Sequence, residues 1–91
     1  MSFERRIAAF LLDLSEQSEA RGDSPIEFPL QMKLQEICNH LEIARATVAG
    51  TFAKFQQEGL IVRSGMQVRI LDMDGLKRRA PPRLVRRQRA S

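Results

Sequence analysis

Residues 34–61 read LQEICNHLEIARATVAGTFAKFQQEGLI, and this stretch decides the fold. The segment from Met32 to Leu41 places its apolar residues on one helical face. A second helical segment, from Ala44 to Glu58, turns three bulky apolar side chains inward: Val48, Phe52 and Phe55. Gly59 is placed to end this segment, because glycine readily adopts the backbone conformation that follows a helix. The stretch therefore predicts two helices joined by a short turn.

A longer amphipathic helix precedes this pair. From Phe3 to Gln17, apolar residues recur three or four positions apart and form one stripe, while the charged residues lie elsewhere around the helix. Ser2 is placed as its N-terminal cap, and residues 18–24 have the composition typical of a loop. Residues 26–30 predict a short extended piece, in which Pro29 argues against a central strand because proline lacks a backbone N–H.

Two β-prone segments follow the helix pair, Leu60–Arg63 and Gln67–Leu71. The Ser64-Gly65 pair between them is typical of a hairpin turn. Asp72 is placed to cap a final short helix, which Pro81-Pro82 ends because proline cannot continue the helical hydrogen bonds.

This order of elements is that of a winged helix-turn-helix, a mainly α fold with a small β-hairpin, and we assign it to residues 1–80. In this fold the second helix of the pair is narrow enough to enter the major groove of duplex DNA. The hairpin, called the wing, rests on the neighbouring backbone or in the minor groove. Helix 44–58 is therefore the candidate recognition helix, and residues 60–71 are the candidate wing.

The 91-residue chain carries a formal charge of +4, which is distributed unevenly. Residues 1–76 hold 8 basic and 11 acidic residues, a net of −3, whereas residues 77–91 hold 7 basic and no acidic residues, a net of +7. We expect residues 81–91 to form a basic, disordered tail. Six side chains near this end are candidate contacts to DNA phosphates: Lys77, Arg78, Arg79, Arg83, Arg86 and Arg87. A tail that only raises solubility is the alternative interpretation.

The composition argues against several other classes of protein. The longest apolar run, IAAFLL at residues 7–12, is far too short to cross a membrane, and the N-terminal residues lack the features of a signal peptide. We therefore expect no membrane partner. The single cysteine, Cys38, excludes an internal disulfide framework, so we expect a cytoplasmic protein. Cys38 faces the predicted core while His40 lies on another side of the same helix, so we expect no metal site. With one histidine and no catalytic constellation, we expect no enzyme and no cofactor.

Three segments together resemble the C-terminal DNA-binding domain of the Crp–Fnr superfamily of bacterial transcription regulators. They read RIAAFLLDLSEQ (6–17), LQEICNHLEIARATVAGTFAKFQQEGLI (34–61) and VRILDMDGL (68–76). The opening segment favours this family over the GntR-type winged helices. The resemblance implies a domain that follows an effector-binding β-barrel and a dimerising helix. Neither is present in these residues, so the chain is expected to be an excised domain or a shortened stand-alone relative.

The chain departs from the family pattern at several positions. Glu42 stands where the turn usually holds Gly, and Ala44 stands where a Ser or Thr usually caps the recognition helix. The usual base-reading Glu and Arg fall on Ala46 and Gly50. A helical wheel independently predicts that the outward face consists of Ala46, Ala49, Gly50, Ala53, Lys54 and Gln57. Most of these side chains are too small to make the bidentate contacts that discriminate between bases.

Arg45 and Thr47 remain from the usual contact set and are the first candidates to anchor helix 44–58 on DNA. For both, an ordinary solvent-exposed position is the alternative. The full set of candidate DNA-binding residues is Arg45, Thr47, Ala46, Gly50, Lys54, Lys33, Arg63 and Arg69. Alternation along the wing predicts that Arg63, Gln67 and Arg69 lie mostly on its solvent side, where they either contact phosphates or discourage strand pairing.

The leading hypothesis is therefore a DNA-binding domain of a Crp–Fnr-like transcription regulator, with double-stranded DNA as its partner. Members of the family bind as dimers, so the chain alone is expected to bind weakly unless it forms a homodimer by another route. The alternative is a winged helix that binds another protein through the small-residue face of helix 44–58. Nonspecific DNA binding driven by the basic tail is a third hypothesis.

Overall fold

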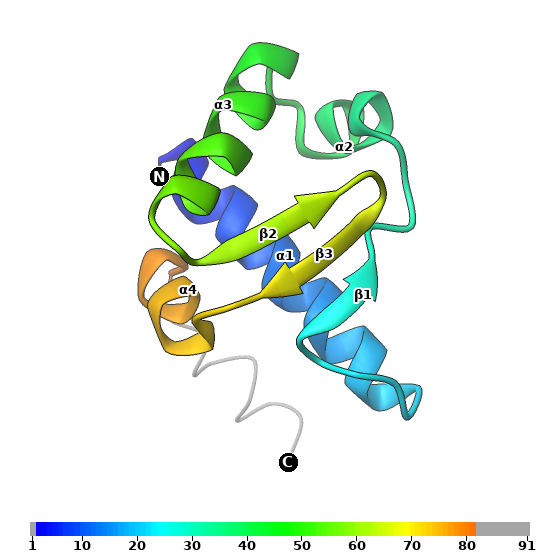
Figure 1. Ribbon diagram of the computed structural model, residues 1–91. Helices are drawn as coiled ribbons and strands as arrows, with labels where there is room; N and C mark the ends of the chain where they lie inside the picture. The colour runs from blue at the N-terminus through cyan, green and yellow to red at the C-terminus, as the bar shows by residue number, and fades with distance from the viewer. Residues whose placement is uncertain (1, 82–91) are drawn as a thin grey trace.

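Four helices and three short strands make up the computed structural model, which describes residues 2–81 (Figure 1). Their order is α1 (Phe3–Ala20), β1 (Glu27–Pro29), α2 (Leu34–Leu41), α3 (Arg45–Gln57), β2 (Ile61–Ser64), β3 (Gln67–Ile70) and α4 (Met73–Arg79). The helix pair α2–α3 is followed directly by the β2–β3 hairpin, which confirms the predicted winged helix-turn-helix. The candidate phosphate contacts Arg83, Arg86 and Arg87, and the expectation of a disordered tail, lie outside the described residues.

Helix α1 begins where the sequence predicts and ends later than predicted, at Ala20. Ser2 caps it, because the Ser2 hydroxyl oxygen accepts a hydrogen bond from a first-turn backbone N–H at 3.2 Å. Its buried face continues through Ser18, whose hydroxyl donates to the Ser24 backbone carbonyl at 2.6 Å. The prediction of a loop is therefore wrong for residues 18–20. Ser18 does not end the helix, and its hydrogen bond ties the turn that follows to the helix.

The turn between α2 and α3 contains a residue in the left-handed region. Glu42 has φ 57° and ψ 45°, a conformation that costs a residue with a Cβ about 1 kcal/mol. The Ile43 backbone N–H donates to the Cys38 carbonyl at 3.1 Å, and the Arg6 guanidinium of α1 donates to the Leu41 carbonyl. The prediction that a non-glycine residue occupies this tight bend is therefore confirmed. A side chain from α1 helps to close the bend.

Hydrogen bonds from backbone N–H groups set the start of α2 and the end of α3. Helix α2 begins two residues later than predicted, where the Glu36 carboxylate accepts from the Lys33 backbone N–H at 2.8 Å. After α3, Gly59 has φ 75°, and the Leu60 backbone N–H donates to the Phe55 carbonyl at 2.9 Å. This bond is part of a Schellman motif, which needs a left-handed residue after the helix. Gly59 thus ends the helix as predicted.

The wing hairpin, β2 and β3, is part of a three-stranded antiparallel sheet, which has one strand more than the sequence predicts. Strand β3 lies between β1 and β2, with Phe28 of β1 opposite Val68 and Ile61 of β2 opposite Ile70. Pro29 therefore sits on an edge strand, where a missing backbone N–H is tolerated. The extended piece at residues 26–30 is confirmed. Its pairing with β3 escapes a local pattern because it depends on burying Phe28 against distant residues.

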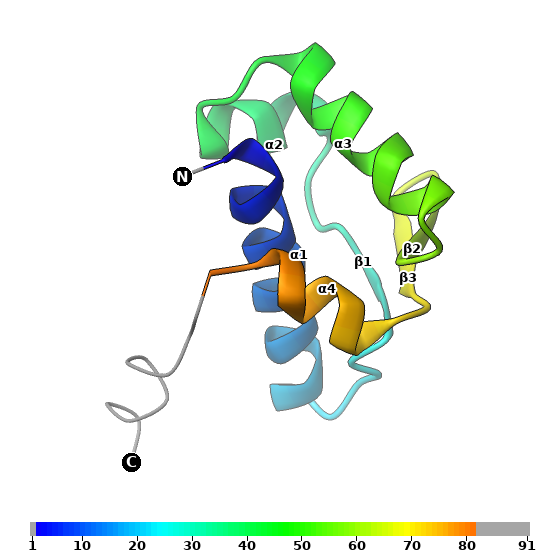
Figure 2. The same cartoon turned by 90° about the vertical axis from the view of Figure 1, so that its left-hand side faces the viewer.

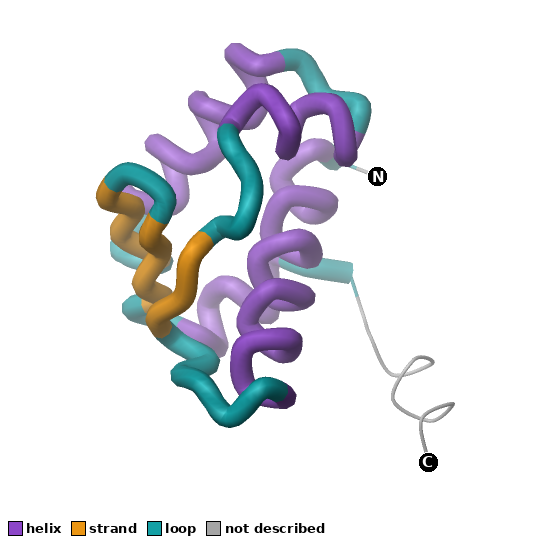
Figure 3. Tube along the Cα trace, turned by 90° about the vertical axis from the view of Figure 1, so that its right-hand side faces the viewer, coloured by secondary structure: helices purple, strands orange, loops and turns teal. Residues whose placement is uncertain are grey.

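The core lies between α1 on one side and the sheet with α3 on the other (Figure 3). Its fully buried large side chains are Ile7, Leu11, Phe28, Leu30, Ile37, Val48, Phe52, Phe55, Ile61, Val68 and Leu76. Helix α4 lies across α1 (Figure 2). Asp72 caps α4 as predicted, because its Oδ1 accepts from the Gly75 backbone N–H at 2.9 Å. None of the helices in residues 2–81 is long and apolar enough to cross a membrane.

Candidate nucleic-acid interface

Helix α3 presents one face to the core and the opposite face to solvent. The buried face includes Val48, Phe52 and Phe55, as predicted. All six residues of the predicted outward face are exposed: Ala46, Ala49, Gly50, Ala53, Lys54 and Gln57. A Cβ added to Gly50 would meet no atom of the described residues within 4 Å, so packing within the domain does not require glycine there. The face expected to lie against DNA is therefore smooth and carries few polar groups.

Polar side chains gather at the N-terminal end of α3. The exposed Arg45 donates from Nη1 to Oε1 of Gln35 at 3.3 Å, and Gln35 donates from Nε2 to Oδ1 of Asn39 at 3.3 Å. This row of three side chains joins the exposed sides of α2 and α3. Thr47 lies in the same first turn of α3 and is only partly exposed. Gln35 and Asn39 are absent from the predicted site, although their spacing of four on a polar helix face was a usable signal.

The two arginines of the wing lie on opposite faces of the sheet. The register pairs Arg63 with Val68 and Val62 with Arg69, so Arg63 shares the core-facing side while Arg69 is exposed. Arg63 is partly buried, and its guanidinium carbon lies 5.5 Å from the centre of the Phe52 ring. The prediction that both arginines face solvent is therefore wrong for Arg63, which covers an aromatic ring at the edge of the core.

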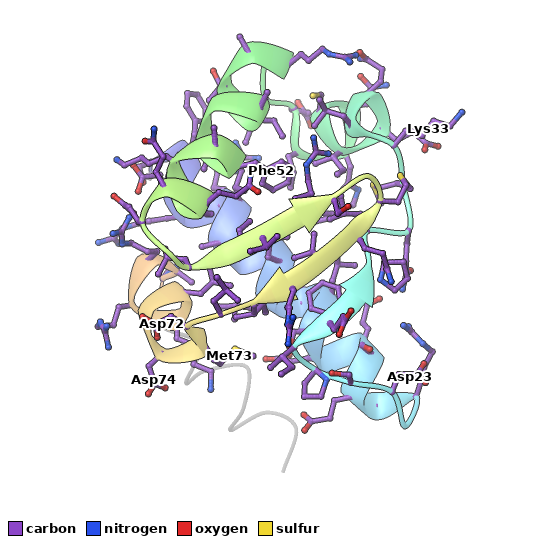
Figure 4. The ribbon with its side chains drawn as sticks, viewed as in Figure 1. Asp23, Lys33, Phe52, Asp72, Met73 and Asp74 are labelled. Atoms are coloured by element: carbon purple, nitrogen blue, oxygen red, sulfur yellow. The ribbon has the colours of Figure 1, made fainter. Side chains whose placement is uncertain are left out.

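Lys33 and Arg69 lie on elements away from α3. Lys33 points into solvent from the residue just before α2, and its side chain is labelled in Figure 4. Arg69 lies in the central strand of the sheet, opposite Glu27 of β1 in the register. Of the predicted site residues, the outer surface of α3 thus brings together Arg45, Ala46 and Gly50, with Lys54 further along the helix.

Lys54 belongs to an ionic network that joins α1, α3 and α4. Its Nζ lies 2.7 Å from Oε2 of Glu4, and the other oxygen of Glu4 accepts from Nη1 of Arg79 at 3.1 Å. Arg79 also places Nη2 2.7 Å from Oε1 of Glu58. The hydrogen bond from Lys54 lowers the pKa of Glu4, and the same bond raises the pKa of Lys54. We call these four residues the Glu4 network.

The last turn of α4 holds three cations that the sequence assigned to the phosphate-binding end of the chain. Lys77 and Arg78 are exposed, whereas Arg79 is partly buried in the Glu4 network. With these three included, residues 2–81 hold 11 basic and 11 acidic residues, a net charge of 0. The described domain is therefore neutral rather than acidic, and the whole excess of +4 lies in residues 82–91.

Cys38 is buried and His40 is exposed, as the helix spacing predicts. The His40 ring lies 6.0 Å from the ring of Phe10, measured between centroids. Within residues 2–81, no group of three His, Cys, Asp or Glu side chains gathers in a way that could hold a metal ion.

Comparison with known families decides the assignment. The model of the Crp-like helix-turn-helix domain matches residues 5–79, from early in α1 to the last residue of α4. This chain belongs to the Crp-like helix-turn-helix domain family. The resemblance of the sequence to the Crp–Fnr DNA-binding domain is thereby confirmed.

Relatives of this Crp-like domain include named transcription regulators. The chain is 46% identical over 77 residues to the transcriptional regulatory protein btr of Bordetella pertussis, covering 85% of this chain and 32% of the relative. It is 48% identical over 73 residues to the transcriptional activator protein FnrA of Stutzerimonas stutzeri, covering 80% and 30%. A solved CRP/FNR-family regulator from Thermus thermophilus superposes with a TM-score of 0.66 at 26% identity, covering 86% of this chain and 40% of that structure. The chain thus spans about a third of the length of the relatives it matches.

Proposed function

We propose that this Crp-like domain binds double-stranded DNA as part of a Crp/Fnr-type transcription regulator in the cytoplasm. The observation that carries the proposal is the placement of α3, which has an exposed face along its length and polar side chains at its N-terminal end. In a helix-turn-helix, this is the arrangement that lets the second helix enter the major groove. Relatives named as transcription regulators support it. We assign the domain no catalytic role.

In this proposal Arg45 is the main anchor. Its guanidinium is exposed and donates to the neutral Gln35 side chain. A phosphate is a charged acceptor and a guanine edge offers two acceptors, so either binds a guanidinium better than the single Gln35 amide oxygen does, and Arg45 turns toward DNA on binding. The Gln35 amide has a second N–H besides the one that donates to Asn39, and this N–H donates to the DNA backbone beside it. Ala46 and Gly50 let the helix backbone approach the base edges closely, and Thr47 supports the first turn.

The remaining contacts are made to phosphates and carry little sequence information. Arg69 of the wing and Lys33 just before α2 are exposed and are the candidates for contacts to the DNA backbone outside α3. Exposed Lys77 and Arg78, with the arginines of residues 82–91, add attraction that does not depend on sequence. Two copies on half-sites about 34 Å apart would supply the affinity that one small domain lacks.

A fluorescence anisotropy titration with a labelled 30-base-pair duplex at low salt tests this proposal. Arg45→Ala is expected to weaken binding by about fivefold or more, because a good arginine contact contributes about 1–3 kcal/mol. Arg21→Ala is the matched control, since Arg21 is an exposed arginine beyond the far end of α1. A chain that ends at Ala80 separates binding by the domain from binding by the tail. If neither Arg45→Ala nor the shortened chain binds more weakly than the full chain, the proposal is contradicted.

A second candidate function is protein binding through the small-residue face of α3. It is favoured by the exposure of Gly50, where the folded domain leaves open space that a closely approaching partner helix fills. Gly50→Leu is expected to abolish the association with a partner protein, whereas unchanged association would exclude this second function.

Binding of DNA by the tail alone predicts a steep dependence of DNA affinity on salt that nearly disappears in the chain ending at Ala80.

A further inference from the structure

Lys54 is the one charged residue on the outward face of α3, and its charge is already engaged. Its Nζ lies 2.7 Å from Oε2 of Glu4, a residue 50 positions earlier in the first turn of α1. The Lys54 side chain is nevertheless 49% exposed. The ammonium group therefore sits at the boundary between the domain and solvent, where another anion can reach it.

Glu4 is held in place from its other side. Arg79 of α4 donates to Oε1 of Glu4 at 3.1 Å and is itself paired with Glu58 at 2.7 Å. These contacts fix the Glu4 carboxylate beside α3 whether or not Lys54 is bound to it. Glu4 is thus a positioned acceptor, while Lys54 is the mobile partner on a long, flexible side chain.

We propose that Glu4 competes with a DNA phosphate for Lys54 and so lowers the affinity of the domain for DNA. This inference rests on the proposed DNA binding. A carboxylate and a phosphate are alternative acceptors for the same ammonium group, and an exposed ion pair contributes little net stability. A new phosphate contact also releases counterions from the DNA. The exchange is therefore nearly balanced, and Glu4 decides how often Lys54 is free.

Salt dependence distinguishes this competition from a purely structural role of Glu4. A phosphate contact made by Lys54 adds about 0.9 to the magnitude of the slope of log affinity against log salt. A residue that only stabilises the fold leaves that slope unchanged. In the native chain, Lys54 is expected to add only part of this amount to the slope, because Glu4 competes for it.

The experiment measures binding of the full chain to a 30-base-pair duplex by fluorescence anisotropy between 50 and 200 mM KCl. We expect Glu4→Gln to bind about threefold more tightly at the low-salt end and to show the steeper slope. Glu19→Gln is the control, because it removes the same charge from an exposed position at the other end of α1. Lys54→Ala should cancel the gain in the Glu4→Gln chain.

Three outcomes overturn the inference. The first is a Glu4→Gln chain that binds like Glu19→Gln, and the second is a gain that persists after Lys54→Ala. The third is a gain in affinity without a change in salt slope. In each of these cases the native chain still binds and Arg45→Ala still weakens binding, so the proposed function stands. If the native chain binds no duplex at any salt concentration, the proposed function and this inference fail together.

A second measurement needs no substitution that alters folding. In the free domain the hydrogen bond from Lys54 lowers the pKa of the Glu4 carboxyl. NMR can follow this pKa as the duplex is added. If a phosphate takes Lys54, this pKa should rise on adding the duplex by more than the pKa of Glu19 does. Equal changes at both carboxyls would contradict the competition.

Discussion

The guanidinium carbon of Arg63 lies 5.5 Å from the centre of the Phe52 ring, so a wing residue covers the buried face of the candidate recognition helix. The Gln56 side-chain oxygen accepts from the Arg63 backbone N–H at 3.1 Å, which ties the same strand to α3 a second time. These contacts orient β2 against α3. The wing is thereby held to the helix it accompanies.

Arg63→Ala is expected to lower the free energy of unfolding by about 1 kcal/mol. The change removes a cation–π contact, which contributes about 0.5–1 kcal/mol, and uncovers part of an aromatic ring. Urea denaturation measures the effect. Arg69→Ala is the control, because Arg69 is exposed on the opposite face of the sheet and its removal should cost less than about 0.5 kcal/mol. Equal losses for the two variants would contradict the placement of Arg63.

Gly75→Ala is expected to destabilise the domain by about 1–3 kcal/mol, the usual cost of overpacking a buried site. A Cβ at residue 75 would lie 2.5 Å from Oδ2 of Asp72 and 2.7 Å from Cδ2 of Leu60. The first clash displaces the carboxylate that caps α4, and the second pushes on the core. Thermal unfolding checks this, and a variant as stable as the native chain would show that α4 begins differently.

Gly50→Ala is expected to have the opposite effect and to stabilise the domain by up to about 1 kcal/mol. Glycine in the interior of a helix is less favourable than alanine by roughly this amount. The site has open space, since an added Cβ meets no described atom within 4 Å. The same thermal unfolding series measures it. A loss of stability would mean that another part of the protein packs against Gly50.

Glu42→Gly is expected to stabilise the domain by about 1 kcal/mol, because Glu42 holds a left-handed conformation that penalises a Cβ. Glu42→Ala keeps the Cβ and serves as the control, so it should give no such gain. Urea denaturation of the two variants separates backbone strain from loss of the carboxylate. A gain shared by both would point to charge instead of strain.

The Glu4 network predicts how stability depends on pH. The hydrogen bond from Lys54 holds the pKa of Glu4 below its ordinary value of 4.5 in the folded domain. A lowered folded pKa means that the ionised carboxylate stabilises the fold. Its contribution is present above the ordinary pKa and is lost as the pH falls through the lowered value. The stability difference between the native chain and Glu4→Gln should therefore shrink as the pH is lowered from 7 to 3. A difference that stays constant would contradict the network.

The order of the elements was predictable because it rests on local patterns. Helical spacing places α1, α2 and α3, and Gly59 and Asp72 mark boundaries that the structure confirms. The burial of α3 followed from the same periodicity, so its exposed small-residue face was also foreseen. The features that the sequence pattern does not predict depend on contacts between residues far apart in the chain. Strand β1 has only three residues and includes a proline, and its pairing with β3 goes with the burial of Phe28 in the core.

The candidate site was predicted less completely than the fold for the same reason. Lys54 and Arg79 are both bound to Glu4, from which they are 50 and 75 residues away, so no motif reveals that they are engaged. Arg63 lies on the core-facing side of its strand, where its guanidinium meets the ring of Phe52 from α3, a contact between separate elements that no local pattern shows. Arg45 was identified from its place at the start of α3. The contact of Arg45 with Gln35 depends on how α2 and α3 pack, so the sequence pattern does not show it.

The most direct test of DNA binding by this Crp-like domain is an NMR titration of the isotopically labelled chain with a 30-base-pair duplex at 150 mM salt. Each backbone amide reports its own change in chemical shift. We predict that the largest changes occur around Arg45 and Gln35, with a second group at the turn between β2 and β3 near Gly65. Changes confined to residues 82–91, or an absence of changes in α3, would contradict it.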